Sequence, residues 1–324
     1  MIPRRDFITL LGGAAAWPLM ARAQQAKVPV IGFLRAGTNR GIVEPPFRQG
    51  LREGGYIEGQ NVDILYRYAD YEFDRLPALA ADLVGRRVAV IVAQGAAPAL
   101  VAKAATTTIP IVFETANDPV ASALVASLRS PGGNMTGVIN MVSDALYAKG
   151  VQILHELLPA SNSVALLINP KNPAPLGRRE TEDATRVLGL NLTVLEASDS
   201  GEIERAFARV AAQHLGGILV NTDGLFDSQI DFVVTLAARY RVPAMYWQPE
   251  QVQAGGLMSY GSSLKEALRI VGNYTARILK GEKPSDLPIQ QSTRFSFVLN
   301  LKAAKAIGLE LPTSILLRAD EVIE

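Results

Sequence analysis

Short runs of apolar, often β-branched residues alternate with amphipathic stretches along almost the whole chain. The runs lie at residues 28–34, 62–69, 88–95, 109–115, 164–170, 192–197, 217–223, 242–247 and 257–261. Near-continuous apolar strands of this kind belong to parallel sheets that helices cover on both faces. Residues 73–86 and 263–280 each carry an apolar stripe at helical spacing and would supply such cover. The alternation therefore predicts an α/β fold with right-handed crossovers between parallel strands.

The pattern contains one internal repeat. A strand, a turn, a helix and a second strand occupy residues 88–115, and the same order recurs over residues 217–247. In both copies the second strand opens on a proline that follows a β-branched residue, at Pro110 and Pro243. Two such units indicate two Rossmann-like, doubly wound lobes with parallel sheets, joined by a hinge.

The predicted first lobe covers residues 28–135 and the predicted second lobe covers residues 136–261. We expect the chain to cross between them near residues 131–138 (PGGNMTGV), where Pro and Gly interrupt the pattern. A returning crossover at about 262–290 would complete the first lobe. Residues 290–324 are predicted to pack across the lobes as strands 294–300 and 314–318 with helix 301–308 between them.

Residues 1–23 have the layout of an export signal. The paired Arg4 and Arg5 precede an apolar stretch at residues 7–20, and the segment ends on Ala-Arg-Ala. This stretch is shorter than the ~20 residues that span a bilayer, which argues against a membrane anchor. We therefore predict a signal peptide of the twin-arginine type, with general secretion as the alternative route. Cleavage after Ala23 would leave the mature protein free in the periplasm.

Charge and cysteine content exclude several classes of protein. The whole chain has a formal charge of +1 and residues 1–23 contribute +2, so the mature chain has a charge of −1. No nucleic-acid partner is expected, because such proteins need a basic face that releases counterions. The absence of cysteine excludes disulfides, thiolate metal ligands and a lipid anchor on Cys. No segment after Met20 is long and apolar enough to embed the mature chain in a membrane.

Signals for an enzyme are weak. The two histidines, His155 in a predicted helix and His214 before a strand, lack the spacing of a metal-ligand pair. No GxGxxG fingerprint, Walker loop or GxSxG elbow occurs in the expected context. No cofactor or metal is therefore predicted. An enzyme would have to rely on Glu114, Asp118 and Asp223 without a histidine partner.

Binding signals are stronger, because four turns end predicted strands at the edge of the sheet where an open α/β fold binds its ligands. These turns are Gln94-Gly95-Ala96-Ala97-Pro98, Thr115-Ala116-Asn117-Asp118-Pro119, Asn221-Thr222-Asp223-Gly224 and Tyr246-Trp247-Gln248. Each precedes a predicted helix, whose first N–H groups and positive dipole end attract an anion such as a carboxylate.

Two residue types in these turns allow alternative roles. Asp118 and Asp223 either meet an ammonium group or act as helix caps and turn formers. Trp247, the only tryptophan after residue 23, either stacks on a flat ligand at the cleft or belongs to the core.

A longer set of motifs resembles a known family. Residues 109–138 read IPIVFETANDPVASALVASLRSPGGNMTGV. They are followed by HELLP (155–159), VALLINP (164–170), NTDG (221–224), GLMSYG (256–261) and ARILKGEKPSDLPI (276–289). This combination resembles the ABC-transporter substrate-binding proteins, in the family that includes tryptophan- and phenylalanine-binding members. The resemblance covers residues 28 to about 320.

The resemblance implies two lobes around a hinged cleft, and a small organic ligand that is delivered to an ABC permease and its ATPase. The ligand loops of the family fall on Gly95, Ala96, Ala97, Thr115, Asn117, Asp118, Asn169, Asn221, Thr222, Asp223 and Trp247. An amino acid, in particular an aromatic one, and an aromatic carboxylate are both candidate ligands. We expect a monomeric binding protein without enzymatic activity.

Two other function classes stay open. A ligand-sensing module of a membrane receptor or kinase would share the fold and the cleft and would differ in its partner. An α/β enzyme would need a titratable pair in the cleft.

Overall fold

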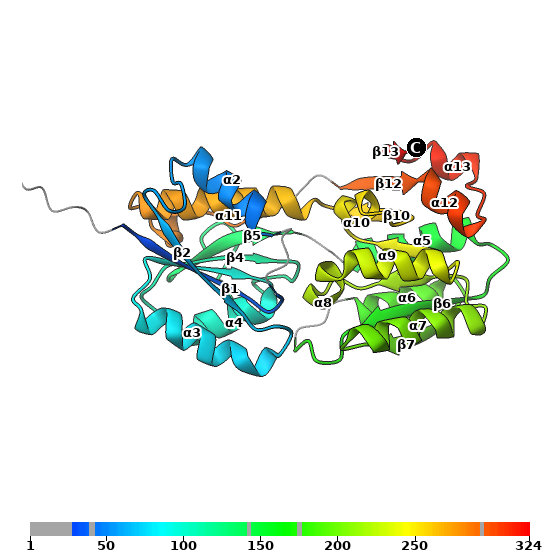
Figure 1. The fold of residues 1–324 in the computed structure, drawn as a ribbon, viewed down its shortest axis with the longest axis horizontal. Coiled ribbons are helices and arrows are strands. Elements are labelled where there is room, and N and C mark those ends of the chain that lie inside the picture. The colour runs from blue at the N-terminus through cyan, green and yellow to red at the C-terminus, as the bar shows by residue number, and fades with distance from the viewer. Residues whose placement is uncertain (1–27, 39–42, 141–143, 174–176, 292–294) are drawn as a thin grey trace, which may run out of the picture.

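Two α/β lobes lie side by side, each built on one sheet that helices cover (Figure 1). This computed structural model describes residues 28–38, 43–140, 144–173, 177–291 and 295–324. The predicted signal peptide lies outside the described residues. The predicted α/β class with two Rossmann-like lobes is confirmed. Within the described ranges, none of the helices has the length and apolar character needed to cross a membrane.

The first sheet has six parallel strands in the order β11-β5-β4-β3-β1-β2. They are β1 (Val30–Arg35), β2 (Asp63–Tyr68), β3 (Val90–Gln94), β4 (Ile111–Thr115), β5 (Met135–Ile139) and β11 (Gln290–Gln291). The helical elements are α2 (Glu44–Glu53), η1 (Phe73–Arg75), α3 (Leu76–Gly85), α4 (Ala96–Ala105), α11 (Leu264–Leu279) and η2 (Pro284–Asp286). Because successive side chains of a strand face opposite ways, Phe33 packs with α2 and α11 while Leu34 packs with α3 and α4.

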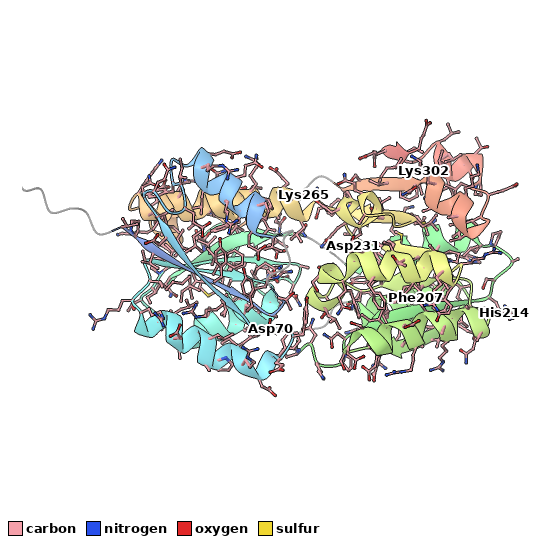
Figure 2. All side chains as sticks on the ribbon, in the orientation of Figure 1. Asp70, Phe207, His214, Asp231, Lys265 and Lys302 are labelled. Atoms are coloured by element: carbon pink, nitrogen blue, oxygen red, sulfur yellow. The ribbon has the colours of Figure 1, made fainter. Side chains whose placement is uncertain are left out.

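The second sheet has seven strands in the order β13-β12-β10-β9-β8-β6-β7, parallel except for the antiparallel pair β10–β12. They are β6 (Ser163–Ile168), β7 (Asn191–Glu196), β8 (Ile218–Val220), β9 (Ala244–Tyr246), β10 (Met258–Gly261), β12 (Ser296–Asn300) and β13 (Glu321–Ile323). Its helices are α5 (Asp144–Leu157), α6 (Arg178–Val187), α7 (Ser200–Ala212), α8 (Gly224–Ser228), α9 (Ile230–Arg239), α10 (Pro249–Gln253), α12 (Leu301–Ile307) and α13 (Thr313–Leu316). Phe207 of α7, marked in Figure 2, is fully buried against this sheet.

The lobe boundaries differ from the predicted ones. β5 pairs with β4, so residues 135–139 belong to the first sheet and the second lobe begins after them. β11 also joins the first sheet, whereas β12 and β13 join the second, so residues 290–324 do not pack across the lobes as predicted. The strand predicted at 314–318 is wrong, since this segment overlaps helix α13. Proline is well tolerated at the start of a helix, which Pro312 occupies. The apolar run after it is too short for its hydrophobic periodicity to distinguish a strand from a helix.

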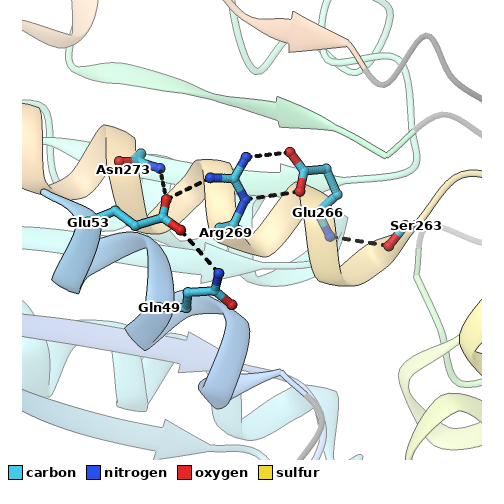
Figure 3. Close-up of polar contacts among 6 residues, drawn as sticks. All are labelled: Gln49, Glu53, Ser263, Glu266, Arg269 and Asn273. Atoms are coloured by element: carbon cyan, nitrogen blue, oxygen red, sulfur yellow. Dashed lines mark hydrogen bonds and ion pairs between the residues drawn. The ribbon is translucent and has the colours of Figure 1, made fainter.

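α11, the helix within the predicted crossover, packs closely against α2 of the first lobe. A Cβ atom on Gly50 would lie only 1.9 Å from the backbone oxygen of Arg269, so glycine is needed for the two helices to touch. On the exposed side of this contact, Arg269 pairs with Glu53 at 2.6 Å and with Glu266 at 2.7 Å, as Figure 3 shows. Backbone contact and ion pairs thus both hold α11 on the first lobe.

Candidate functional site

A cavity of about 90 Å³ lies between the lobes, at the carboxyl ends of their parallel strands. The first lobe contributes Gln94, Gly95, Ala96, Glu114, Ala116 and Asn117. The second lobe contributes Asn172, Thr222, Asp223, Gly224, Asp227 and Gln248. Asn140 and Leu264 complete the lining. Predicted site residues from both lobes therefore meet around one space.

Gly95 begins helix α4 at the first-lobe rim of this cavity. Its φ of +99° is a conformation that side-chain-bearing residues rarely adopt, which explains the glycine. Among the described residues no side chain caps α4, and the N–H groups of Ala96 and Ala97 come too early in the helix to have a partner within it. Ala96 lines the cavity and Ala97 is buried behind it. These N–H groups and the helix dipole favour a negatively charged ligand group.

Asp223 forms the opposite rim and caps helix α8. Its Oδ1 accepts hydrogen bonds from the N–H of Leu225 at 2.9 Å and from Nδ2 of Asn169 at 3.1 Å. Its Oδ2 accepts a third from Nδ2 of Asn172 at 2.7 Å. The residue is 5% exposed, and its burial raises the pKa of the carboxyl group although these hydrogen bonds act in the other direction. Asp223 is thus both a cap and a lining residue.

Asn169 and Asn221 are buried behind this rim and do not line the cavity. Asn169 orients the carboxylate of Asp223 through the hydrogen bond just described. Asn221 accepts a hydrogen bond from the hydroxyl of Tyr147 at 2.5 Å, and the same hydroxyl lies 3.2 Å from Oγ1 of Thr222. Tyr147 was not predicted. Asn169 thus positions the carboxylate of Asp223, and Tyr147 positions the hydroxyl of Thr222.

The three predicted residues at the end of β4 and in the turn that follows it have different roles. Thr115 is buried, and its Oγ1 accepts a hydrogen bond from the N–H of Asn117, which lines the cavity, at 3.0 Å. Asp118 is exposed and does not line the cavity. Its Oδ1 accepts hydrogen bonds from the N–H groups of Val120 at 2.8 Å and Ala121 at 3.1 Å. The structure therefore supports the turn-forming alternative for Asp118.

Trp247 is fully buried in the core of the second lobe. Its ring centroid lies 4.4 Å from that of Tyr147, and a Cβ atom on Gly150 would come within 2.6 Å of it. The neighbouring Gln248 lines the cavity instead. Of the two roles predicted for Trp247, the structure thus supports the one in the core.

Two carboxylates of the lining, Glu114 and Asp227, are missing from the predicted ligand-binding set. Glu114 accepts a hydrogen bond from Nε2 of Gln94 at 3.0 Å, and Asp227 accepts one from Nε2 of Gln251 at 2.9 Å. Burial raises the pKa of Glu114 to about 7. Burial and the neighbouring charge of Asp223 raise the pKa of Asp227 to about 8. Their positions, within a strand and within a helix, carry no turn signal by which the sequence reveals them.

The described lining is acidic, since it contains the carboxylates of Glu114, Asp223 and Asp227 and, among the residues that the structure describes, no lysine, arginine or histidine. Arg35 of β1, whose charge lowers the pKa of both Glu114 and Asp227, is itself paired with Glu44 at 3.7 Å. The cavity therefore favours a cationic ligand group beside its carboxylates. In the part of the chain that the structure describes, no cluster of three or more His, Cys, Asp or Glu residues could hold a metal ion.

Neither histidine lines the cavity. His214 is exposed at the end of the second lobe that faces away from the first lobe (Figure 2). His155 lies in α5, on the second lobe. A histidine general base is thus absent from the lining of this cavity.

Comparisons with known proteins agree with the two-lobed α/β fold. The model of the family described as ABC transporter substrate binding protein matches residues 27–323. A protein named "Tyrosine-binding protein" from Clostridioides difficile is 23% identical over 82% of this chain and 76% of its own length. A conserved domain protein from Vibrio cholerae has a structure with a TM-score of 0.78 and 26% identity, covering 91% of this chain and all of that one. An ABC domain from Streptococcus pneumoniae in complex with L-Trp has a TM-score of 0.76 and 22% identity, covering 91% and 99% of the two chains.

Proposed function

The chain belongs to the family of ABC transporter substrate-binding proteins, and we propose that it captures an α-amino acid between its two lobes. Substrate-binding proteins of this family are extracytoplasmic. We propose further that the protein delivers its ligand to the permease and ATPase of an ABC importer. It acts in this proposal as a monomer without enzymatic activity.

One observation supports the choice of ligand class: one rim of the cavity favours an anionic group and the other favours a cationic group. The uncapped start of α4 beside Gly95 suits a carboxylate, and the carboxylates of Asp223 and Asp227 suit an ammonium group. An α-amino acid carries both groups on one carbon atom. A plain aromatic carboxylate, the other candidate, would leave the buried acidic rim without a cationic partner.

In the proposed complex, the ligand carboxylate accepts hydrogen bonds from the N–H groups of Ala96 and Ala97. The ammonium group donates to Asp223 and Asp227. Thr222 and Asn117, which line the same cavity, add neutral hydrogen bonds. Asp118 and Trp247 are left out of this contact set, because they do not line the cavity.

An aromatic side chain on the ligand is supported by the relative from Clostridioides difficile, which is named a tyrosine-binding protein. The cavity, about 90 Å³, is smaller than the roughly 300–1,000 Å³ of typical ligand pockets. The lobes must therefore part to admit such a ligand. We propose that they rotate about the segments near Asn140 and Leu264, where the chain passes between them.

For the route to this location, we propose that residues 1–23 are a twin-arginine signal that is cleaved after Ala23 in the periplasm. The paired Arg4 and Arg5 support this route, since a twin-arginine receptor reads two guanidinium groups and not only positive charge.

A thermal-shift titration tests the proposed function. The mature chain, residues 24–324, is titrated with each of the L-amino acids and, as matched controls, with the deaminated analogues of phenylalanine, tyrosine and tryptophan. A ligand that binds only the folded state raises Tm with its concentration, by the equivalent of about 2.7 kcal/mol at a hundred times Kd. We expect this from an aromatic amino acid and not from its deaminated analogue. A rise with the analogues alone would overturn the amino-acid assignment.

A further inference from the structure

A row of polar side chains crosses the first sheet just below the cavity. Arg35 of β1 is the register partner of Gln94 on β3, and Gln94 is the partner of Glu114 on β4. The three side chains share one face of the sheet, because register partners of parallel strands point the same way. Gln94 donates its amide hydrogen to Oε2 of Glu114 at 3.0 Å. Arg35, 1% exposed, is engaged by Glu44 at the start of α2.

This row leaves Glu114 without an ion-pair partner of its own. The arginine that lies on its face of the sheet forms its ion pair with Glu44, at 3.7 Å. Lys265, at the start of α11, directs its ammonium group to Oε1 of Gln253 at 3.3 Å. Among the described residues, no ion pair to Glu114 exists. Within its described residues, the first lobe therefore presents the carboxylate of Glu114 to the cavity without an ion-pair partner.

The second lobe presents negative charge to the same cavity. Asp223 and Asp227 line it together with Glu114. Glu250 of α10 adds a further negative charge that acts on Asp227. Neither Asp223 nor Asp227 has an ion-pair partner within the described ranges. When the lobes meet without a ligand, carboxylates of both lobes thus share a space of about 90 Å³.

We propose that Glu114 determines the charge class of the ligand: opposed to Asp227 across the cleft, it holds the empty lobes apart and lets them close around a cationic group. This inference rests on the proposed function and adds a residue that decides ligand specificity. Like charges in a small, water-poor space repel, and a cation between them reverses the sign of the interaction. A plain anion would only add to the repulsion.

The raised pKa values fit this inference. With the lobes in contact, the pKa of Glu114 is raised to about 7 and that of Asp227 to about 8, so the empty cavity tends to bind protons in place of a ligand cation. The groups that act on this pair are Arg35, Asp223 and Glu250 together with Gln94. A ligand that binds the closed state better than the open state then shifts the population toward closure.

A distance measurement on the ligand-free protein tests the inference without knowledge of the natural ligand. The chain has no cysteine, so spin labels can be placed on two introduced ones. Asp74 and Glu196 are suitable positions, because both are exposed and they lie on different lobes. Asp74 follows the edge strand β2 of the first lobe, and Glu196 is the last residue of the edge strand β7 of the second lobe. The doubly labelled mature chain is refolded from denaturant to remove bound ligand and measured at about pH 8.

In that experiment, Glu114→Gln keeps the side-chain length and an oxygen that can accept the hydrogen bond of Gln94. We expect the variant to shift the ligand-free distance distribution toward the short, closed value, raising the closed fraction several-fold over the wild type. Asp227→Asn should do the same from the other lobe. Glu310→Gln, the same change at an exposed position outside the cavity, should have no effect. Identical distributions for wild type, Glu114→Gln and Asp227→Asn would overturn the inference.

A second measurement separates this inference from the proposed function. L-Tyrosine and 3-(4-hydroxyphenyl)propanoate, which lacks the ammonium group, are titrated into the wild type and Glu114→Gln. We expect the preference for tyrosine to fall about ten- to a hundred-fold in the variant, as for the loss of a charge-assisted contact. An unchanged preference would count against Glu114. If neither probe binds the wild type, the proposed ligand class fails, and the distances alone decide the role of Glu114.

Discussion

The two rims of the cavity start from equivalent positions of the internal repeat and differ in chemistry. Gly95 follows β3 and Asp223 follows the corresponding strand β8, and each is the residue before the next helix. Gly95, with φ of +99°, leaves the start of α4 uncapped, whereas Asp223, with φ of −154°, caps α8 with its own side chain. One copy of the repeat therefore offers free N–H groups, and the other offers a buried carboxylate. The comparison shows how one βαβ unit used twice can give two rims with different charge preferences.

The largest loss of affinity is expected when the first rim receives the residue of the second rim. Gly95→Asp would place a carboxylate where the ligand carboxylate is proposed to bind. Because like-charge contact costs several kcal/mol, affinity for L-tyrosine should fall more than about a hundred-fold in titration calorimetry. Gly95→Ala is the matched control, since it has the same backbone strain of about 1–3 kcal/mol without the charge. Equal affinities of the two variants would remove the carboxylate from this rim.

At the second rim, Asp223→Asn removes the charge and keeps the size. Affinity for L-tyrosine should fall about ten- to a hundred-fold, because a charge-assisted contact is lost. Stability should fall by about 1–2 kcal/mol, since the new amide group must face the donors of Asn169 or Asn172. Asp118→Asn, the same change at an exposed turn, should leave affinity unchanged. A fall in Tm without a fall in affinity would make Asp223 a structural cap alone.

Removal of a contact beside the two rims should have a smaller effect on ligand binding. The ring of Tyr71, on the first lobe, packs against the core of the second, and a Cβ atom on Gly224 would lie 3.9 Å from it. The adjacent Asp70 lies on the side of the first lobe that faces the second (Figure 2). Tyr71→Ala should speed ligand release about three- to tenfold in surface plasmon resonance, consistent with the loss of part of one buried side chain. Tyr71→Phe should stay closer to the wild type, because it keeps the ring that packs against the second lobe. A slow release in both variants would show that the contact does not hold the lobes together.

The acidic rim also predicts a modest pH dependence of stability. The pKa of Glu114 is raised to about 7 and that of Asp227 to about 8, above the ~4 of an unfolded carboxyl group. The stabilisation that follows is complete below the unfolded value and is lost as the pH rises through the folded values. The Tm of ligand-free protein should therefore fall by a few degrees between about pH 5.5 and pH 8, and opening of the lobes limits this fall because it returns both carboxyl groups to water. The double variant Glu114→Gln and Asp227→Asn should flatten this profile, and a Tm that rises over the same range in the wild type would contradict the assignment.

Much of the fold was predictable, because long apolar strands and amphipathic helices leave a clear period in the sequence. β5 was not recognised as part of the first lobe, since the Pro and Gly residues before Met135 obscure where the first sheet ends. Helix α13 was read as a strand, because one apolar turn has no period. These errors fall on short elements, where tertiary contacts decide the structure.

The lining of the cavity was predictable where turns contribute to it. Gly95, Asn117, Thr222 and Asp223 were found because they follow strands, and all of them line the cavity. Glu114 and Asp227 were not placed among the binding residues, since only the approach of the lobes brings these regular-structure residues together. For Trp247, the sequence left open a core role and a cleft role, and the three-dimensional packing against Tyr147 distinguishes them.

The central claim is that the cavity recognises both charges of an α-amino acid, one on each rim. Titration calorimetry of the mature wild-type chain with L-tyrosine, with 3-(4-hydroxyphenyl)propanoate and with tyramine tests it most directly. The two analogues each lack one charged group and keep the ring. We predict that L-tyrosine binds at least about ten-fold more tightly than either analogue, because each loses one charge-assisted contact. Binding of either analogue as tight as that of L-tyrosine would contradict the claim.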